Sequence, residues 1–155
     1  MATWDELATA APELEETARR LLTRSGIGEG LLATVRGKAP PRINPVYAEV
    51  VDGRLLTFAI ATSAKAADLA GDGRFALHTH IAPAAPDEFS VRGRAREVTD
   101  PVLRAHALAA WAFDATDGYR LLDLDIEYSL LGRRPTADDW PPAYTAWRAP
   151  DGGSH

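Results

Sequence analysis

The chain contains no cysteine among its 155 residues. Disulfide bridges, thiolate metal sites and cysteine nucleophiles are therefore excluded. No apolar run approaches the roughly 20 residues that a transmembrane helix requires. The N-terminal segment MATWDE is acidic, whereas a signal peptide begins with positive charge. We therefore expect a cytoplasmic protein with no membrane partner.

Positive charge is also scarce, because 17 Lys and Arg residues stand against 22 Asp and Glu residues and give a net charge of −5. A nucleic-acid-binding protein needs a basic surface, so we expect no nucleic-acid partner. The sequence also lacks internal repeats, a GxGxxG fingerprint, a P-loop and a Ser/His/Asp nucleophile elbow. These absences argue against the common dinucleotide-binding, NTP-binding and hydrolase sites.

The content of 46% hydrophobic and 25% charged residues is typical of a globular domain. Alternation of apolar and polar residues predicts a mainly β (α+β) protein, in which about six strands form a β-barrel with peripheral helices. The predicted strand segments are 31–35, 40–51, 55–60, 74–80, 89–98 and 119–131, with a last extended piece at 144–148. We expect covering helices in 1–28, the barrel domain in 29–149 and a disordered tail in 150–155.

The corner at residues 60–65 (IATSAK) joins a predicted buried strand to a short predicted helix. Thr62 or Ser63 can cap this helix, because a hydroxyl there accepts hydrogen bonds from free backbone N–H groups. Lys65 faces the positive end of the helix dipole, which is unfavourable unless an anion is bound. The corner therefore predicts a phosphate site. The simpler alternative is a solvated Lys65 that pairs with Asp68 one turn later.

A second candidate wall of a site is the segment 42–46 (RINPV). Pro45 cannot donate to a sheet ladder, so it marks an edge, a bulge or a departure from the sheet. Arg42 and Asn44 lie on one side of an extended chain. Next to backbone that does not pair, they predict a ligand wall, and the alternative is a bulged edge strand with polar surface groups.

Two further polar rows lie on predicted strands. His78 and His80 share one face, but a metal site needs a third ligand and none is clearly supplied. We therefore predict packed or surface histidines and no metal site. Arg92, Arg94 and Arg96 share the face of another strand, where they are either solvated or bound to an acidic ligand.

The longest predicted strand, 119–131, has leucine, isoleucine and tyrosine alternating with acidic residues. One face should therefore be core. The other face, with Asp123, Asp125 and Glu127, is expected to be acidic and exposed.

The order of these elements resembles the pyridoxamine 5′-phosphate oxidase-like, FMN-binding split-barrel superfamily. The resemblance is carried by the segments 41–46 (PRINPV), 52–58 (DGRLLTF), 63–69 (SAKAADL), 73–78 (GRFALH), 91–95 (VRGRA) and 146–148 (AWR). It covers most of the chain from Leu31 to Arg148. The resemblance implies a six-stranded split β-barrel with peripheral helices, and a homodimer with the cofactor at the subunit interface.

In that superfamily the cofactor phosphate is held by an arginine of the second strand and by a Ser-x-Lys at the helix start. Here these residues would be Arg42, Ser63 and Lys65. Many members carry a basic residue immediately before the lysine, where this chain has Ala64. The full cofactor-binding set that the resemblance implies is Arg42, Asn44, Pro45, Val46, Ala61, Thr62, Ser63, Lys65 and Trp147.

The Ala-, Arg- and Pro-rich sequence looks more like the actinobacterial branch, some of whose members use the deazaflavin F420 in place of FMN. We therefore predict an FMN- or F420-dependent oxidoreductase acting on a small conjugated organic substrate. Vitamin B6 oxidation is not expected, because the substrate residues of true pyridoxamine phosphate oxidases are not evident. No catalytic residue is predicted. The alternatives are a non-enzymatic protein that binds FMN, F420 or haem, and a dimeric structural module without a ligand.

Overall fold

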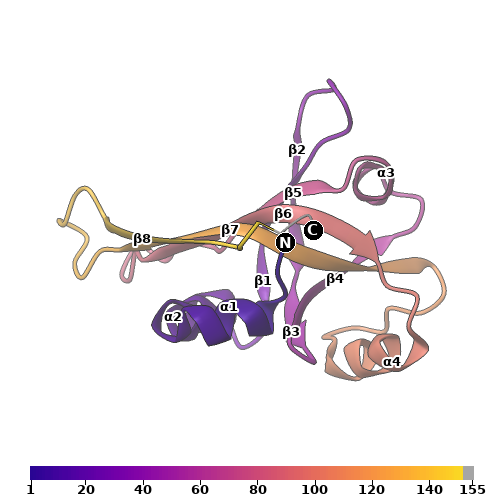
Figure 1. Cartoon of the computed structure of the whole chain (residues 1–155), viewed down its shortest axis with the longest axis horizontal. Helices are drawn as coiled ribbons and strands as arrows, with labels where there is room; N and C mark the ends of the chain where they lie inside the picture. Colours follow the sequence, from indigo (N-terminus) through magenta and orange to yellow (C-terminus); the bar gives the residue numbers. More distant parts are fainter. Residues whose placement is uncertain (152–155) are drawn as a thin grey trace.

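One curled antiparallel sheet makes up most of the molecule (Figure 1). The computed structural model describes residues 1–151, so the tail predicted for 150–155 lies from residue 152 onward outside the described residues. The strand order is β2-β1-β5-β6-β7-β4-β3, and β8 pairs with β7. The strands are β1 (Glu29–Thr34), β2 (Arg42–Tyr47), β3 (Glu49–Val51), β4 (Arg54–Ile60), β5 (Arg74–His78), β6 (Glu88–Glu97), β7 (Tyr119–Arg133) and β8 (Ala143–Arg148).

The sheet has eight strands, whereas the sequence predicted about six. The predicted segment 40–51 divides at Ala48 into β2 and β3, which pair with β1 and β4 respectively. The predicted extended piece near the C-terminus is a regular strand, since β8 is antiparallel to β7 along its whole length. Alternation of side chains does not show where an extended segment changes from one partner strand to another. The predicted number of strands was therefore too low.

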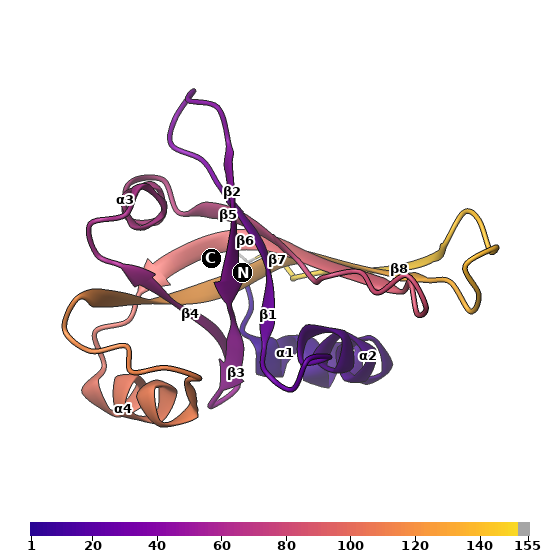
Figure 2. The ribbon, with the colours of Figure 1, turned by 180° about the vertical axis from the view of Figure 1, so that it is seen from behind.

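Helices cover the sheet (Figures 1 and 2). The helices are α1 (Trp4–Ala10), α2 (Pro12–Leu22), α3 (Ala64–Gly71) and α4 (Pro101–Ala110). In both views α1, α2 and α4 lie below the long β6–β7 ribbon, and α3 lies above it. Within residues 1–151, no helix combines the length and the apolar character that crossing a bilayer requires.

The larger hydrophobic core is formed by the sheet, the two N-terminal helices and α3. Thr3 and Glu6 form a capping box that starts α1. Trp4 is fully buried, and its ring meets Phe89 of β6 edge to face at a centroid distance of 6.0 Å. The helix α2 adds the buried side chains of Leu14, Ala18, Leu21 and Leu22. A smaller core packs α4 against β4, with Phe58 and Trp111 at a centroid distance of 4.8 Å.

A β-bulge interrupts the pairing of β6 with β7. Arg92 pairs with Tyr128 while Gly93 pairs with Ile126, so that Glu127 is the extra residue. A Cβ atom at Gly93 would lie 1.9 Å from the carbonyl oxygen of Asp125. Glycine is therefore required where the two strands approach this closely.

The acidic face of β7 was predicted to be exposed, but two of its three residues are buried, so the prediction was wrong for these two. Asp123 and Asp125 are 4% and 8% exposed. Asp123 forms an ion pair with Arg54, and Asp125 accepts a hydrogen bond of 2.6 Å from Nε of Arg96. Burial raises the pKa of Asp123 above its ordinary value, although Arg54 acts in the opposite direction. Counter-charges from neighbouring strands, which alternation cannot reveal, allow these carboxylates to be buried.

Candidate functional site

The start of α3 is organised by Ser63. Its hydroxyl accepts a hydrogen bond of 3.1 Å from the N–H of Ala66 and donates one of 2.7 Å to the carbonyl of Ile60. Ser63, not Thr62, is the N-cap residue. The N–H groups of Ala64 and Lys65 in the first turn make no hydrogen bond within residues 1–151. They therefore remain available as donors to a ligand.

A groove of about 380 Å³ opens between β2 and the start of α3. The structure thus brings together four residues of the predicted cofactor-binding set from two segments of the chain. Backbone N–H donors beside two cationic side chains are suited to binding an anion. The residues that line the groove are Arg42, Ile43, Asn44, Ser63, Ala64 and Lys65.

The Lys65 side chain is half-buried in this groove. Burial lowers the pKa of its ammonium group from the ordinary lysine value, because the charged form loses hydration. No carboxylate of the described residues forms an ion pair with Lys65. The predicted alternative, a solvated Lys65 paired with Asp68, is therefore not what the structure shows.

Asp68 instead binds two arginines. Its Oδ2 accepts hydrogen bonds from Nε of Arg42 at 3.0 Å and from the hydroxyl of Thr34 at 2.9 Å. Its Oδ1 lies 3.6 Å from Nε of Arg36 and accepts no hydrogen bond. Asp68 is 1% exposed. A buried carboxylate thus contacts Arg42, which lines the groove, and Arg36, and the shortest contact to each guanidinium is through Nε.

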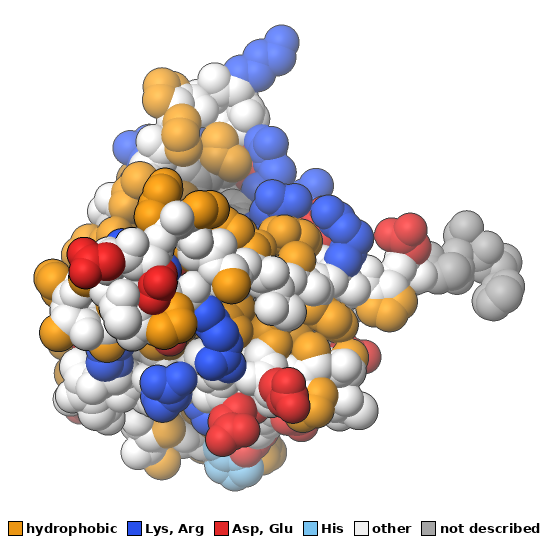
Figure 3. Space-filling model, turned by 90° about the vertical axis from the view of Figure 1, so that its left-hand side faces the viewer, with side chains coloured by type: hydrophobic (Ala, Val, Ile, Leu, Met, Phe, Trp, Pro, Cys, Tyr) orange, Lys and Arg blue, Asp and Glu red, His pale blue; other side chains and the backbone are white. Residues whose placement is uncertain are grey.

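The turn between β1 and β2 is fixed to the C-terminal end of α3. Oδ2 of Asp72 accepts a hydrogen bond of 2.8 Å from the N–H of Gly37, and Arg74 donates to the Gly37 carbonyl at 3.1 Å. The bond from the Arg74 side chain, followed by the bond from Gly37, holds the pKa of Asp72 well below its ordinary value. Figure 3 shows this hairpin as a protrusion with Lys and Arg side chains at its tip and base.

The other residues of the predicted cofactor set do not line the groove. Pro45 and Val46 line a neighbouring hollow of about 260 Å³, together with Glu29, Tyr47 and His80. Ala61 and Thr62 are exposed in the turn before α3. Trp147 lies on β8, half-buried against the larger core. Four strands separate β8 from β2 in the order of the sheet, and Trp147 of the same chain does not line the groove.

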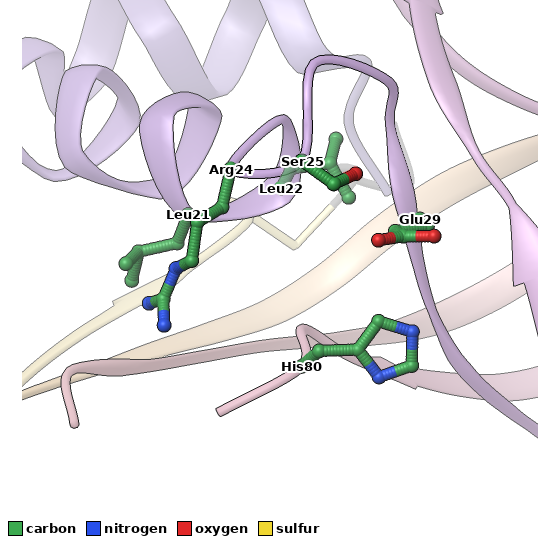
Figure 4. Close-up of a pocket in the computed structure, with 6 residues that line it drawn as sticks. All are labelled: Leu21, Leu22, Arg24, Ser25, Glu29 and His80. Carbon is green, nitrogen blue, oxygen red and sulfur yellow. The ribbon is translucent and has the colours of Figure 1, made fainter. Parts of the chain in front are cut away.

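A second hollow adjoins the one at Pro45 and shares Glu29 and His80 with it. Figure 4 shows Glu29 of β1 and His80 below the end of α2, with Arg24 and Ser25 from the following turn. Nη1 of Arg24 donates to the carbonyl of Ala85 at 3.2 Å, which ties this turn to the loop before β6. The hollow measures about 120 Å³, which suits a small group and not a whole cofactor.

His78 of the predicted histidine row and all three residues of the predicted arginine row have structural partners, whereas His80 is exposed. Nδ1 of His78 contacts the carbonyl of Thr79 at 2.6 Å. Residues 1–151 contain no group of three or more side chains that could hold a metal ion. Arg92 stacks on Tyr128 at 4.5 Å, and Arg94 donates to the Asp72 carbonyl at 3.2 Å. With Arg96 bound to Asp125, each arginine of the row has a partner inside the chain.

Sequence reasoning missed Asp68 and Arg36 as parts of this site. One signal was present, because an aspartate between Ala66 and Leu69 interrupts the buried face of a short helix. Pairing the predicted strands about their turn would also have placed Thr34 opposite Arg42. Contact between Asp68 and Arg42 is a tertiary feature, however, and no local pattern encodes it.

No protein-family model matches the chain, and no curated protein matches its sequence. Solved structures do match its fold. PhzG from Burkholderia lata 383, in complex with tetrahydrophenazine-1-carboxylic acid, has a TM-score of 0.61 at 14% identity over 96% of this chain and 86% of that chain. The heme storage protein HutZ from Vibrio cholerae has a TM-score of 0.59 at 14% identity, covering 74% of this chain and 90% of that chain. The chain has the split-barrel fold.

A heme-binding protein from Mycobacterium smegmatis has a TM-score of 0.62 at 16% identity. The match covers 82% of this chain and 56% of that chain, so the chain spans little more than half of that protein. Identities this low establish the fold alone. The predicted fold class, a mainly β split barrel with peripheral helices, is thereby confirmed. The sheet has eight strands and not the predicted six.

Proposed function

We propose that this split barrel binds FMN or F420 through the phosphate and acts as an oxidoreductase on a small conjugated organic substrate. The groove between β2 and α3 carries this proposal. It contains Arg42, which pairs with Asp68, and the half-buried Lys65, which forms no ion pair with a carboxylate of the described chain. It also offers the first-turn N–H groups of Ala64 and Lys65. These are the donors that a phosphate requires.

The residues beyond the groove fit the remainder of such a cofactor. Val46 lies roughly 13 Å along the extended strand β2 from Arg42. The hollow at Pro45 and Val46 is lined partly by apolar side chains. A phosphate bound at Arg42 and a ring directed toward Val46 would use both regions. The cofactor supplies hydride chemistry, while the chain anchors the phosphate, orients the ring and excludes water.

A second copy of the chain completes the proposed site. Trp147 belongs to the implied cofactor set but lies on the opposite part of the sheet from Arg42. The outer face of β1 and β2 exposes apolar side chains, with Leu31 40% and Ile43 67% exposed. Association of two copies through this face would cover those side chains. We therefore propose a homodimer with the cofactor at the subunit interface.

The test is a fluorescence titration of the purified protein with FMN and with F420, repeated with Lys65→Ala. We expect saturable binding of one cofactor and a weakening of at least tenfold in the variant, because a charge-assisted hydrogen bond contributes about 1.5–3 kcal/mol. Lys38→Ala is the matched control, since Lys38 is the other lysine of the chain and is exposed in the β1–β2 turn. If neither FMN nor F420 binds, the proposal is contradicted.

The second candidate function is non-enzymatic binding or storage of haem. Two structures of similar fold, HutZ and the mycobacterial protein, are described as heme storage and heme-binding proteins. His80 is exposed and lines both hollows near Val46, which places one imidazole beside a partly apolar cavity. Titration with haem, followed by its absorption spectrum in wild type and His80→Ala, tests this candidate. A chain that binds none of the three ligands would be a structural module.

A further inference from the structure

We propose that Asp68 is a positioning residue that presents Arg42 to a dianionic phosphate monoester. This inference rests on the proposed function, because it concerns the same anion groove. Oδ2 of Asp68 accepts the Nε–H of Arg42 at 3.0 Å. A guanidinium has five N–H donors, so this bond uses one and leaves the four on the two Nη atoms. Within residues 1–151 those Nη groups donate no hydrogen bond.

The carboxylate side of this contact is buried and hydrogen-bonded. The carboxylate is 1% exposed and is also held by the Thr34 hydroxyl at 2.9 Å. Thr34 itself is 1% exposed and lies directly opposite Arg42 in the β1–β2 pairing. Asp68 is thus fixed from the helix and from the strand beside Arg42. The Arg42 side chain, by contrast, is 46% exposed, and its guanidinium is oriented by the bond from Nε to Asp68.

Arg36 compensates the negative charge that Asp68 brings to the site. Its Nε lies 3.6 Å from Oδ1, the carboxylate oxygen that accepts no hydrogen bond. The Cδ atom of Arg36 also lies 3.6 Å from where a Cβ would stand on Gly71, so its stem passes over the end of α3. With Asp68 balanced by Arg36, Arg42 and Lys65 keep two positive charges for the groove. A phosphate monoester carries about −1.5 to −2 at pH 7, which matches this charge, whereas a phosphodiester carries one negative charge.

Substitution of Asp68 by Asn separates positioning from simple electrostatics. Asp68→Asn removes a negative charge from behind an anion site, so electrostatics alone predicts tighter phosphate binding. Loss of the Arg42 orientation predicts weaker binding. We expect the FMN affinity of Asp68→Asn to fall at least tenfold while the riboflavin affinity stays within a factor of two, because riboflavin lacks the phosphate. A merely structural role would change both affinities together.

Two further variants keep the test decisive. Thr34→Val removes the other hydrogen bond to Asp68 without touching a guanidinium, so its FMN affinity should fall, but by less than that of Asp68→Asn. In an Arg42→Lys background, Asp68→Asn should cause no further loss, because lysine has no Nε–Nη fork to orient. If Asp68→Asn does not fold by circular dichroism, Arg36→Gln should still lower FMN affinity several-fold by leaving Asp68 uncompensated.

Inorganic phosphate separates this inference from the proposed function. Its binding is measured by the rise in melting temperature of wild type and Asp68→Asn, and methyl phosphate is compared with dimethyl phosphate in the same way. Weaker phosphate binding by the variant, and preference for the monoester, support the inference even if FMN and F420 both fail to bind. Equal or tighter binding of FMN or phosphate by Asp68→Asn overturns the role of Asp68. Absence of both cofactor and phosphate binding in wild type overturns both proposals.

Discussion

The indole Nε1 of Trp4 donates a hydrogen bond of 2.6 Å to Oε1 of Glu15, and this bond joins α1 to α2. The same carboxylate oxygen accepts a hydrogen bond of 2.6 Å from Nε of Arg19, and the Arg19 guanidinium lies 5.8 Å from the Trp4 ring centroid. One buried aromatic side chain therefore fixes two helices and contacts Phe89 of the sheet.

Trp4→Ala should lower the free energy of unfolding by about 3–5 kcal/mol, because it leaves a cavity between the helices and the sheet. Trp4→Phe should cost less, since it keeps a ring and loses chiefly the bond to Glu15. The measurement is urea unfolding followed by circular dichroism. Trp140→Ala is the control, because Trp140 is 75% exposed and such substitutions change stability by about 0.5 kcal/mol or less. Equal effects at the two positions would contradict this assignment of the core.

Cofactor affinity should fall as the pH rises through the alkaline range below the ordinary lysine pKa. The pKa of Lys65 is lowered by burial, so in the free protein its ammonium loses the proton earlier than an exposed lysine does. A bound phosphate favours the charged form, and binding above that pKa therefore requires uptake of a proton. Titrations between pH 7 and 9.5 should show this loss in wild type and not in Lys65→Met. If the affinity of Lys65→Met falls with pH as steeply as that of wild type, the pH dependence belongs to another group.

The contact of Asp72 with Gly37 and Arg74 should make stability depend on acidic pH. The folded pKa of Asp72 is depressed, so its contribution is present above the unfolded value of about 3.9 and is lost as the pH falls below it. Asp72→Asn should therefore be less stable than wild type at pH 7, and the difference should shrink toward pH 3. Urea unfolding at both pH values measures it. Asp138→Asn is the control, since Asp138 is exposed and makes no ion pair within residues 1–151.

Ile43→Asp should dissociate the proposed homodimer. Ile43 is 67% exposed on the face of β2 that the second copy would cover, and a buried unpaired carboxylate there is unfavourable. Sedimentation velocity should give a dimer for wild type and a monomer for the variant. Val102→Asp is the matched control, because Val102 is 59% exposed on α4, away from that face. A monomeric wild type, or a variant that stays dimeric, would contradict the proposed interface.

Features that depend on a few neighbouring residues could be predicted from the sequence. The capping box of Thr3 and Glu6 and the Ser63 cap are present, because each needs residues only three apart. The Asp52-Gly53 turn is present as well, with positive φ values of 49° and 73° that these residue types tolerate. Local chemistry thus determined where elements begin and end, and the ordered set of segments indicated the fold.

Features that depend on distant segments could not be predicted in this way. The two carboxylates on β7 are buried because Arg54 and Arg96 reach them from β4 and β6. Asp68 pairs with an arginine 26 positions away instead of with Lys65. Of the predicted cofactor set, Arg42, Asn44, Ser63 and Lys65 meet in one groove, whereas Trp147 remains on another part of the sheet.

The bulge at Glu127 exchanges the inner and outer sides of β7. Before it, the even-numbered residues Leu122, Leu124 and Ile126 enter the larger core, and after it the odd-numbered Leu131 does so. If Glu127 took a regular place in the ladder instead of bulging, Tyr128 would turn inward and Leu131 toward solvent, and β8 would move with them because it pairs with this half of the strand. The single extra residue therefore decides which side of β7 faces the core before and after the bulge, and its position is as constrained as the composition of the strand.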